Sequence, residues 1–269
     1  TLASEVRILG DGAVFRDMRS TLFTIQPGSP PIRFSGLVFR NMQSLAPAII
    51  VHGGDVTFDG CVFDANPSAL LVDGGHVDIT NSTFTRNGHA TKRGGAIDID
   101  AEASLQIESS AFFANVAMEG GAIRLSGDAS LMINSSSFTA NLAELGGAFF
   151  TSGAARLSLS NTLITENNAT HGAALNVADN ARVILSNQTA LVNNNKQRLL
   201  ASTVQLSGNA SSTGTGGTEG RFLYLLPAPL AHWVANSITC NAHASTLEES
   251  CTPEFYGQTY SSLPFGTLE

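Results

Sequence analysis

Large apolar residues recur along this chain at nearly constant intervals, and this regularity limits the folds that it can adopt. Successive members are 24, 24, 21, 28, 26, 26 and 27 residues apart. The column comprises Phe15, Phe39, Phe63, Phe84, Phe112, Phe138, Ile164 and Leu191. A repeat of this length is typical of one structural unit stacked along an axis. Because so small a unit cannot bury its own apolar face, neighbouring units must pack together to form a core.

Each unit also contains short alternating segments. Apolar and polar residues alternate before the column, as in Val56-Thr57-Phe58, and a second alternation, as in Ala96–Ile99, opens each unit. Such alternation predicts strands with one buried face. Three short strands in about 25 residues predict an all-β fold, a single-stranded parallel β-helix of about seven coils with an irregular C-terminal segment. We expect it to be right-handed, because parallel crossover connections almost always are.

Turn residues recur with the same period. Asparagine follows the column by three residues in six successive units, at Asn66, Asn87, Asn115, Asn141, Asn167 and Asn194. Asparagine tolerates left-handed backbone angles, and stacked asparagine side chains can hydrogen-bond along a ladder. Glycine pairs at 94–95, 120–121 and 146–147 predict tight corners. We therefore expect a structural ladder in which the rings of Phe63, Phe84, Phe112 and Phe138 are buried and stacked, accompanied by Asn66, Asn87, Asn115 and Asn141.

Two of these signatures resemble the repeat of the chlamydial polymorphic outer membrane proteins. They are GGAI at 94–97 and 120–123, and F-x-x-N at 63–66, 84–87, 112–115 and 138–141. The resemblance covers residues 47–195, with degraded copies at 146–149, 164–167 and 171–174, and similar repeats are found in surface proteins of algae and other protists. In that family the repeats form the surface-exposed passenger of an autotransporter and act in adhesion. The resemblance implies an extracellular or cell-surface location and a glycan or protein partner.

The chain divides into three parts. Residues 1–207 carry the β-helix repeats, 208–220 form a Ser/Thr/Gly-rich flexible loop, and 221–269 form a C-terminal cap or linker. The chain begins within a coil and without a signal peptide, so we expect a fragment of a longer protein or a segment processed at both ends. The sequence CTPEFYG at 251–257 resembles the start of cysteine-rich ephrin-receptor-like modules, which implies that such a module follows.

Cysteine usage is sparse. Cys240 and Cys251 are a disulfide candidate, because the short intervening segment can close readily in an oxidising compartment. Cys61 precedes Phe63 by two residues and should share its inward face as a buried free thiol.

Composition excludes some classes of partner. The net charge of −8 argues against nucleic acid, which needs a basic stripe. The apolar run at 221–234 is too short and too rich in proline to be a transmembrane segment.

Five sequons are candidate N-glycosylation sites, at Asn81, Asn134, Asn168, Asn187 and Asn209. Asn81 and Asn187 share a turn position with Asn161, so a structural asparagine explains these two equally well.

The sequence offers no set of catalytic residues. A glycoside hydrolase needs two carboxylates flanking the bond, whereas the acids here are dispersed over different faces. Asp98 should pair with Arg124 in the next unit, in a cross-strand ion pair that contributes well under about 1 kcal/mol. Lys92 and Arg93 lie in a solvated loop beside His89. The chain contains no HExxH, G-x-S-x-G or phosphate-loop motif.

We therefore predict a protein that is not an enzyme and has no catalytic, metal-binding or cofactor-binding residues. Its expected role is adhesion, or that of a structural spacer at the cell surface. One alternative is a structural subunit of a filament or coat, which would carry an apolar stripe on its outer face. The other is a polysaccharide-active enzyme, which would gather acids in one groove.

One outward surface is a candidate partner face. Ile50 and Leu71 occupy outward positions in successive coils, about 4.8 Å apart. Contiguous exposed apolar residues usually mark contacts, so we expect this face to pack against another polypeptide. Cover by the C-terminal segment of the same chain is an equally good explanation.

Overall fold

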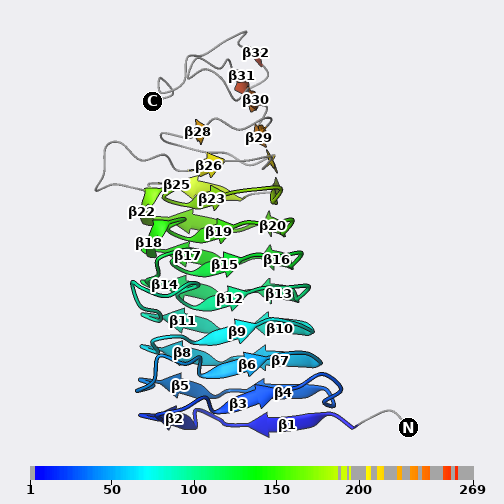
Figure 1. Cartoon of the computed structure of the whole chain (residues 1–269), viewed down its shortest axis with the longest axis vertical. Helices are drawn as coiled ribbons and strands as arrows, with labels where there is room; N and C mark the ends of the chain where they lie inside the picture. The colour runs from blue at the N-terminus through cyan, green and yellow to red at the C-terminus, as the bar shows by residue number, and fades with distance from the viewer. Residues whose placement is uncertain are drawn as a thin grey trace.

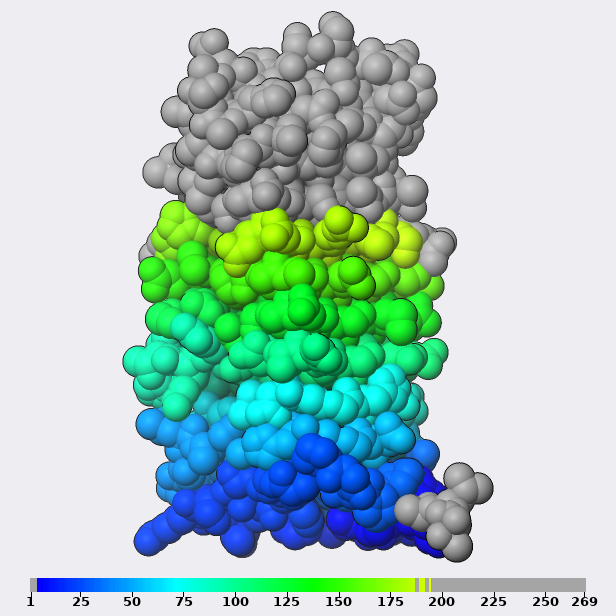
Figure 2. Space-filling view, turned by 45° about the vertical axis from the view of Figure 1, so that its right-hand side comes forward, coloured from blue at the N-terminus to red at the C-terminus, as the bar shows by residue number. Residues whose placement is uncertain are grey.

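The three strands expected in each unit form a column of stacked coils (Figure 1). This computed structural model describes residues 4–186, 189–192 and 194, together with the backbone of seven short strands between residues 204 and 259. The coils follow one another in sequence order as parallel layers (Figure 2). The prediction of an all-β parallel β-helix is confirmed, because three parallel sheets run along the column axis.

Sheet A contains the alternating segments that precede the apolar column. In spatial order its strands are β1 (Val6–Leu9), β4 (Ile32–Ser35), β7 (Asp55–Asp59), β10 (His76–Thr80), β13 (Ser104–Glu108), β16 (Ser130–Asn134), β20 (Arg156–Ser160), β24 (Arg182–Ser186), β27 (Ser211–Gly214), β29 (Ala231–Ala235), β30 (Ile238–Ala242), β31 (Cys251–Phe255) and β32 (Gln258–Thr259). Pairing is parallel from β1 to β29 and antiparallel from β29 to β32.

Sheet B carries the apolar column itself. Its strands are β2 (Val14–Arg16), β5 (Val38–Arg40), β8 (Val62–Asp64), β11 (Thr83–Thr85), β14 (Ala111–Phe113), β17 (Ser137–Thr139), β21 (Leu163–Thr165) and β25 (Ala190–Val192).

Sheet C contains the segments that open each unit. Its strands are β3 (Phe23–Ile25), β6 (Ile49–Val51), β9 (Leu70–Val72), β12 (Ile97–Ile99), β15 (Ile123–Leu125), β19 (Phe149–Thr151), β23 (Leu175–Val177), β26 (Val204–Leu206) and β28 (Leu223–Leu225). A fourth, two-stranded sheet D joins β18 (Leu142–Leu145) to β22 (Asn168–His171) at the corner between sheets B and C.

The phenylalanine ladder is confirmed. Phe63, Phe84, Phe112 and Phe138 are register partners in sheet B, and each is at most 1% exposed. Their rings stack nearly parallel, with centroids 4.6, 4.7 and 4.5 Å apart. This spacing matches the distance between adjacent strands, so the pairing of the backbones brings the rings into contact. A second stack, which the sequence analysis did not identify, joins Phe34 of sheet A to Phe58 at 5.0 Å.

The asparagine ladder is also confirmed, and its bonding is continuous. Asn66, Asn87, Asn115, Asn141 and Asn167 are fully buried. Each side-chain amide donates to the Oδ1 atom of the next asparagine, as from Asn87 to Asn115 at 3.1 Å. The same Oδ1 accepts the backbone N–H of the preceding ladder residue. The ladder thereby satisfies polar groups that the turn would otherwise leave buried without partners.

The left-handed backbone of this turn lies one residue before each asparagine. The φ angles there are between 53° and 58°, at Ala65, Arg86, Ala114, Ala140 and Glu166. Tolerance of left-handed angles is therefore not the reason for asparagine in the ladder. It does apply at the corner between sheets A and B, where Asn81 and Asn161 have φ values of 51° and 49°.

The glycine corners have a steric cause. Gly94, Gly120 and Gly146 have positive φ, and a Cβ atom on any of them would collide with a backbone carbonyl oxygen three residues later. Only glycine allows the backbone to turn this closely.

One polar side chain points into the apolar interior. Thr151 of β19 is the register partner of Leu125 and Val177, and its buried hydroxyl has no hydrogen-bond partner among the described residues. Leaving such a group unpaired costs about 1–3 kcal/mol.

We predict that Thr151→Val raises the free energy of unfolding by about 1 kcal/mol in chemical denaturation. The matched control is Thr162→Val, which should lower it, because the Thr162 hydroxyl donates to the Ser160 carbonyl at 2.8 Å. A loss of stability in Thr151→Val would contradict this assignment.

Several predictions lie outside the described residues, apart from the backbone of the short strands β27 to β32. They are the flexible loop at 208–220, the cap or linker at 221–269, the Cys240 and Cys251 side chains and the sequons at Asn187 and Asn209. The backbone register of β30 and β31 sets Cys240 opposite Cys251, and the disulfide stays a prediction. Cys61 is a buried free cysteine as expected, and burial raises the pKa of its thiol.

Candidate ligand-binding site

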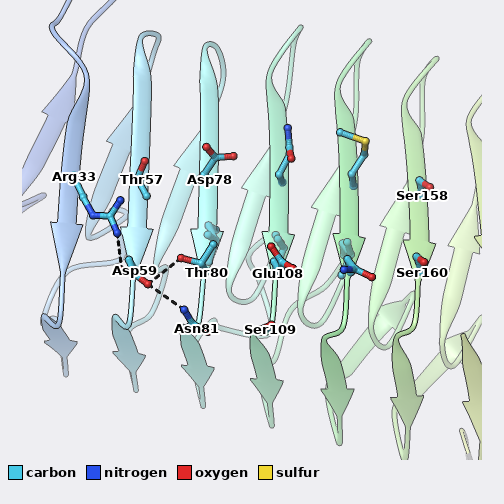
Figure 3. Close-up of a pocket in the computed structure, with 16 residues that line it drawn as sticks. Arg33, Thr57, Asp59, Asp78, Thr80, Asn81, Glu108, Ser109, Ser158 and Ser160 are labelled. Carbon is cyan, nitrogen blue, oxygen red and sulfur yellow. Dashed lines mark hydrogen bonds and ion pairs between the residues drawn. The ribbon is translucent and has the colours of Figure 1, made fainter. Parts of the chain in front are cut away.

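A groove of about 980 Å³ follows the outer face of sheet A, near the ends of its strands. It crosses six strands, from β4 to β20, and its side chains form rows along the axis (Figure 3). Polar outward residues line it: Arg33, Thr57, Asp59, Asp78, Thr80, Asn81, Gln106, Glu108, Ser109, Asn134, Ser158 and Ser160. Because the strands pair without slippage, like positions recur every 4.8 Å or so, and the groove presents a regular array of hydrogen-bonding groups.

Asp59 is the most heavily bonded residue of the groove. Its carboxylate accepts from Arg33 at 2.7 Å, from Thr80 at 3.0 Å and from Asn81 at 3.2 Å (Figure 3). The hydrogen bond from Asn81, followed by those from Thr80 and Arg33, lowers the pKa of Asp59 against the opposing effect of burial. Asp59 is therefore an ionised group held in place, which suits it to accept hydrogen bonds and does not suit it to donate a proton.

The groove is acidic. Asp59, Asp78 and Glu108 all line it, and Arg33 is the one basic residue among its lining residues. The expectation that the acids are dispersed over different faces is wrong for these three, because alternation turns all of them outward on sheet A. Within the part of the chain that the structure describes, no three His, Cys, Asp or Glu side chains are placed to hold a metal ion.

A second polar cluster lies on the outer face of sheet C. Arg124 contacts Asp98 at 2.9 Å and Glu119 at 3.1 Å, and its side chain is only 10% exposed. Burial raises the pKa of Asp98, against the opposing effect of Arg124. Burial would lower the pKa of Arg124, yet the neighbouring carboxylates, Asp98 first, raise it.

The expected pair between Asp98 and Arg124 is therefore present, but it is more buried than the sequence indicated. The two side chains are 22% and 10% exposed, so this is not a solvent-screened surface pair. Removing one partner of a largely buried pair leaves an uncompensated charge. Arg93 extends the network to Glu119 at 3.3 Å, and Ser126 donates to Asp100 at 2.8 Å. We assign this cluster a structural role, because its charged groups already bind one another.

Two of the predicted sequons lie in the groove. Asn81 bonds to Asp59 at its edge, and Asn134 accepts from the Asn161 side chain at 3.0 Å. A glycan on either side chain would occupy the groove. Asn168 lies in β22, where its buried Oδ1 atom finds no hydrogen-bond partner in the described part of the chain. Glycosylation of these residues stays a prediction.

The structure places Ile50 and Leu71 side by side, as register partners in sheet C. Both side chains are half-buried, and the contact of this face with another polypeptide stays a prediction. Met132 and Ile184 of sheet A are 48% and 50% exposed, but Ser158 separates them in the register.

Among the described residues, no helix has the length and apolar character to cross a membrane.

Comparison with known proteins bears on the fold. A family model described as a right handed beta helix region matches residues 26–209. Neither the curated proteins nor the solved structures contain a match to this chain.

Proposed function

Since the chain belongs to the right-handed β-helix family, we propose that it is a non-catalytic extracellular or cell-surface protein that binds an extended glycan on sheet A. The role is adhesion. The remaining coils of the column hold the groove on sheet A at a distance from the surface to which the protein is attached. The observation that carries the proposal is the polar groove across six consecutive strands.

The shape and chemistry of the groove favour a chain-like ligand. Five strand spacings of about 4.8 Å give the groove a length of about 24 Å, which suits an oligosaccharide better than a single sugar. Hydroxyl, amide and carboxylate groups recur along it, and these pair well with sugar hydroxyls. Because acids outnumber bases in the groove, a neutral glycan fits it better than a polyuronate, whose charge would be repelled.

The bonding of Asp59 removes one of the three acids of the groove as a candidate catalytic acid. Glycoside hydrolysis needs one carboxyl that is protonated and a second that is ionised. Three donors hold Asp59 ionised, so this residue cannot serve as the acid.

A polysaccharide-active enzyme is the second candidate function. Its support is that Asp59, Asp78 and Glu108 line the same groove. Right-handed β-helix domains include both enzymes and non-enzymes, so membership of the family favours neither candidate.

Glycan binding tests the proposal directly. We expect the wild-type chain to bind neutral oligosaccharides saturably, on an array and in titration, and the double variant Asp78→Ala/Gln106→Ala to bind at least about tenfold more weakly. The control is Thr139→Ala, an outward change on sheet B that should leave binding unaltered. Both variants should keep the free energy of unfolding within about 0.5 kcal/mol.

Two results would contradict the non-catalytic proposal. Equal glycan binding by wild type and double variant would remove the groove as the site. Release of shorter sugars from neutral or uronic-acid polymers, abolished by Asp78→Asn or Glu108→Gln, would establish the enzyme instead.

A further inference from the structure

One corner of the β-helix varies in length while the sheets keep their register. This corner joins the asparagine ladder to the start of each sheet C segment. It comprises residues 67–68 in the short coil after Phe63, but residues 43–47 in the coil before and 88–95 in the coil after. The same difference appears in the sequence as the 21-residue interval followed by the 28-residue interval. The short coil therefore has no corner loop, whereas the coils directly before and after it each have one.

A cleft of about 410 Å³ lies at this level. Ser68 and Leu71 of the short coil form its floor. Asp98, the register partner of Leu71 in sheet C, belongs to the floor as well. One wall is formed by Leu45 and Pro47 from the preceding coil, and the opposite wall by Thr91, Lys92, Arg93 and Met118 from the following coils. A volume of this size is within the range of small-ligand sites.

Backbone hydrogen bonds fix the wall that contains Lys92 and tie the residue after Pro47 to the floor. On one side, the Lys92 N–H donates to the His89 carbonyl at 2.8 Å, and the Met118 N–H donates to the Lys92 carbonyl at 2.7 Å. On the other side, the Ala48 N–H donates to the Ser68 carbonyl at 3.0 Å. The backbone of Lys92 is thus hydrogen-bonded within a loop whose residues Thr91 and Arg93 are exposed. A preformed cleft loses little conformational freedom when it binds a ligand.

The cleft combines an apolar interior with a free cation. Leu71 and Met118 are half-buried in it, and Leu45 at its mouth is 52% exposed. Asp98 is paired with Arg124, and Arg93 with Glu119. The Lys92 ammonium makes no hydrogen bond or ion pair with any residue that the structure describes. The uncompensated charge in the cleft is therefore positive, on a chain whose net charge is −8.

We propose that this cleft binds a segment of a partner polypeptide through an apolar side chain and an adjacent carboxylate. The apolar side chain would pack on Leu71 and Met118, and the carboxylate would pair with Lys92. The apolar side chains of Leu45, Leu71 and Met118 line the cleft together with the Lys92 ammonium, and a polypeptide segment carries an apolar side chain and a carboxylate at adjacent positions. This site lies at the corner that leads into sheet C, shares no lining residue with the groove on sheet A, and does not depend on the glycan proposal.

The methionine methyl groups provide separate reporters for the two sites. Met118 lines the cleft, Met132 lines the groove, Met42 is buried and Met18 lies on the first coil. In the full chain with labelled methionine methyls, we expect acetyl-Phe-Asp-amide to shift the NMR signal of Met118 saturably and to leave that of Met132 in place. The matched probe acetyl-Phe-Asn-amide, which lacks the charge, should bind about fivefold more weakly.

Charge variants complete the test. Lys92→Gln should weaken binding of the acidic dipeptide about fivefold, whereas Arg156→Gln, which removes an exposed charge on sheet A, should not change it. The absence of any Met118 shift, or equal affinity for the acidic and amide dipeptides, would overturn the proposal. A shift of Met132 by oligosaccharides is read separately, so failure of the glycan proposal would be distinguishable from failure of this one.

Discussion

Phe112→Ala is expected to lower the free energy of unfolding by about 3–5 kcal/mol. The ring of Phe112 is 1% exposed and stacks between those of Phe84 and Phe138, at 4.7 and 4.5 Å. Truncation removes the transfer free energy of the ring and leaves a cavity that the neighbouring coils cannot close, because their positions are fixed by backbone pairing. Chemical denaturation measures this difference in the free energy of unfolding. Two spectroscopic probes that report the same transition establish that unfolding is two-state.

The neighbouring residue provides the control. Phe113 has the same side chain but points outward and is 48% exposed. Phe113→Ala should change the free energy of unfolding by no more than about 0.5 kcal/mol. If the two variants lose similar stability, the inward ladder is not the principal core of the column.

Asn115→Ala is expected to cost about 3 kcal/mol or more, although it removes only a small polar side chain. The Asn115 Oδ1 atom accepts from the backbone N–H of Asn87 at 2.9 Å and from its side-chain amide at 3.1 Å. The Asn115 amide donates to the Phe84 carbonyl at 3.0 Å and to the Oδ1 atom of Asn141 at 2.9 Å. Truncation leaves several of these buried groups without partners, each at a cost of about 1–3 kcal/mol.

Asn115→Asp separates the hydrogen bonds from the shape of the side chain. The carboxylate keeps the acceptor but replaces two donated hydrogen bonds with repulsion between oxygens, so the variant should be destabilised at neutral pH. Acidification, which protonates the carboxyl and restores a donor, should recover part of the loss. Asn161→Ala, at an exposed turn, is the control and should have a much smaller effect. A loss below about 1 kcal/mol in Asn115→Ala would show that the ladder does not stabilise the fold.

The inward-facing residues were predictable from the sequence because each repeat of a β-helix stacks on the repeat before it. Residues one period apart, such as Phe84 and Phe112, become register partners, so the spacing alone identified the buried ladder. The pairing of Asp98 with Arg124 followed from the same rule. The burial of that pair did not, because Glu119 comes from a corner loop whose path the alternation of the strands does not specify.

The outer surface was harder to predict. Alternation shows that Asp59, Asp78 and Glu108 point outward, but it does not show that one groove collects them. Asp59 and Glu108 are the last residues of their strands, where the chain bends toward sheet B, and the depth of that bend depends on backbone angles. The cleft did have a sequence signal, in the 21-residue interval followed by the 28-residue interval. Unequal periods, read as differences in loop length, would have located it.

At the corner that carries the cleft, loops that form the binding surface differ in length while the residues that stabilise the fold keep their positions. Residues 67–68 and 88–95 fill equivalent places, yet Phe63, Phe84 and Phe112 remain in register on both sides. New segments can thus be grafted at this corner without altering any residue of the interior, and doubling the length of such a segment costs only about 0.6 kcal/mol in closure entropy. The column is in this sense a scaffold for variable loops, on which recognition can diversify while the apolar and asparagine ladders stay unchanged.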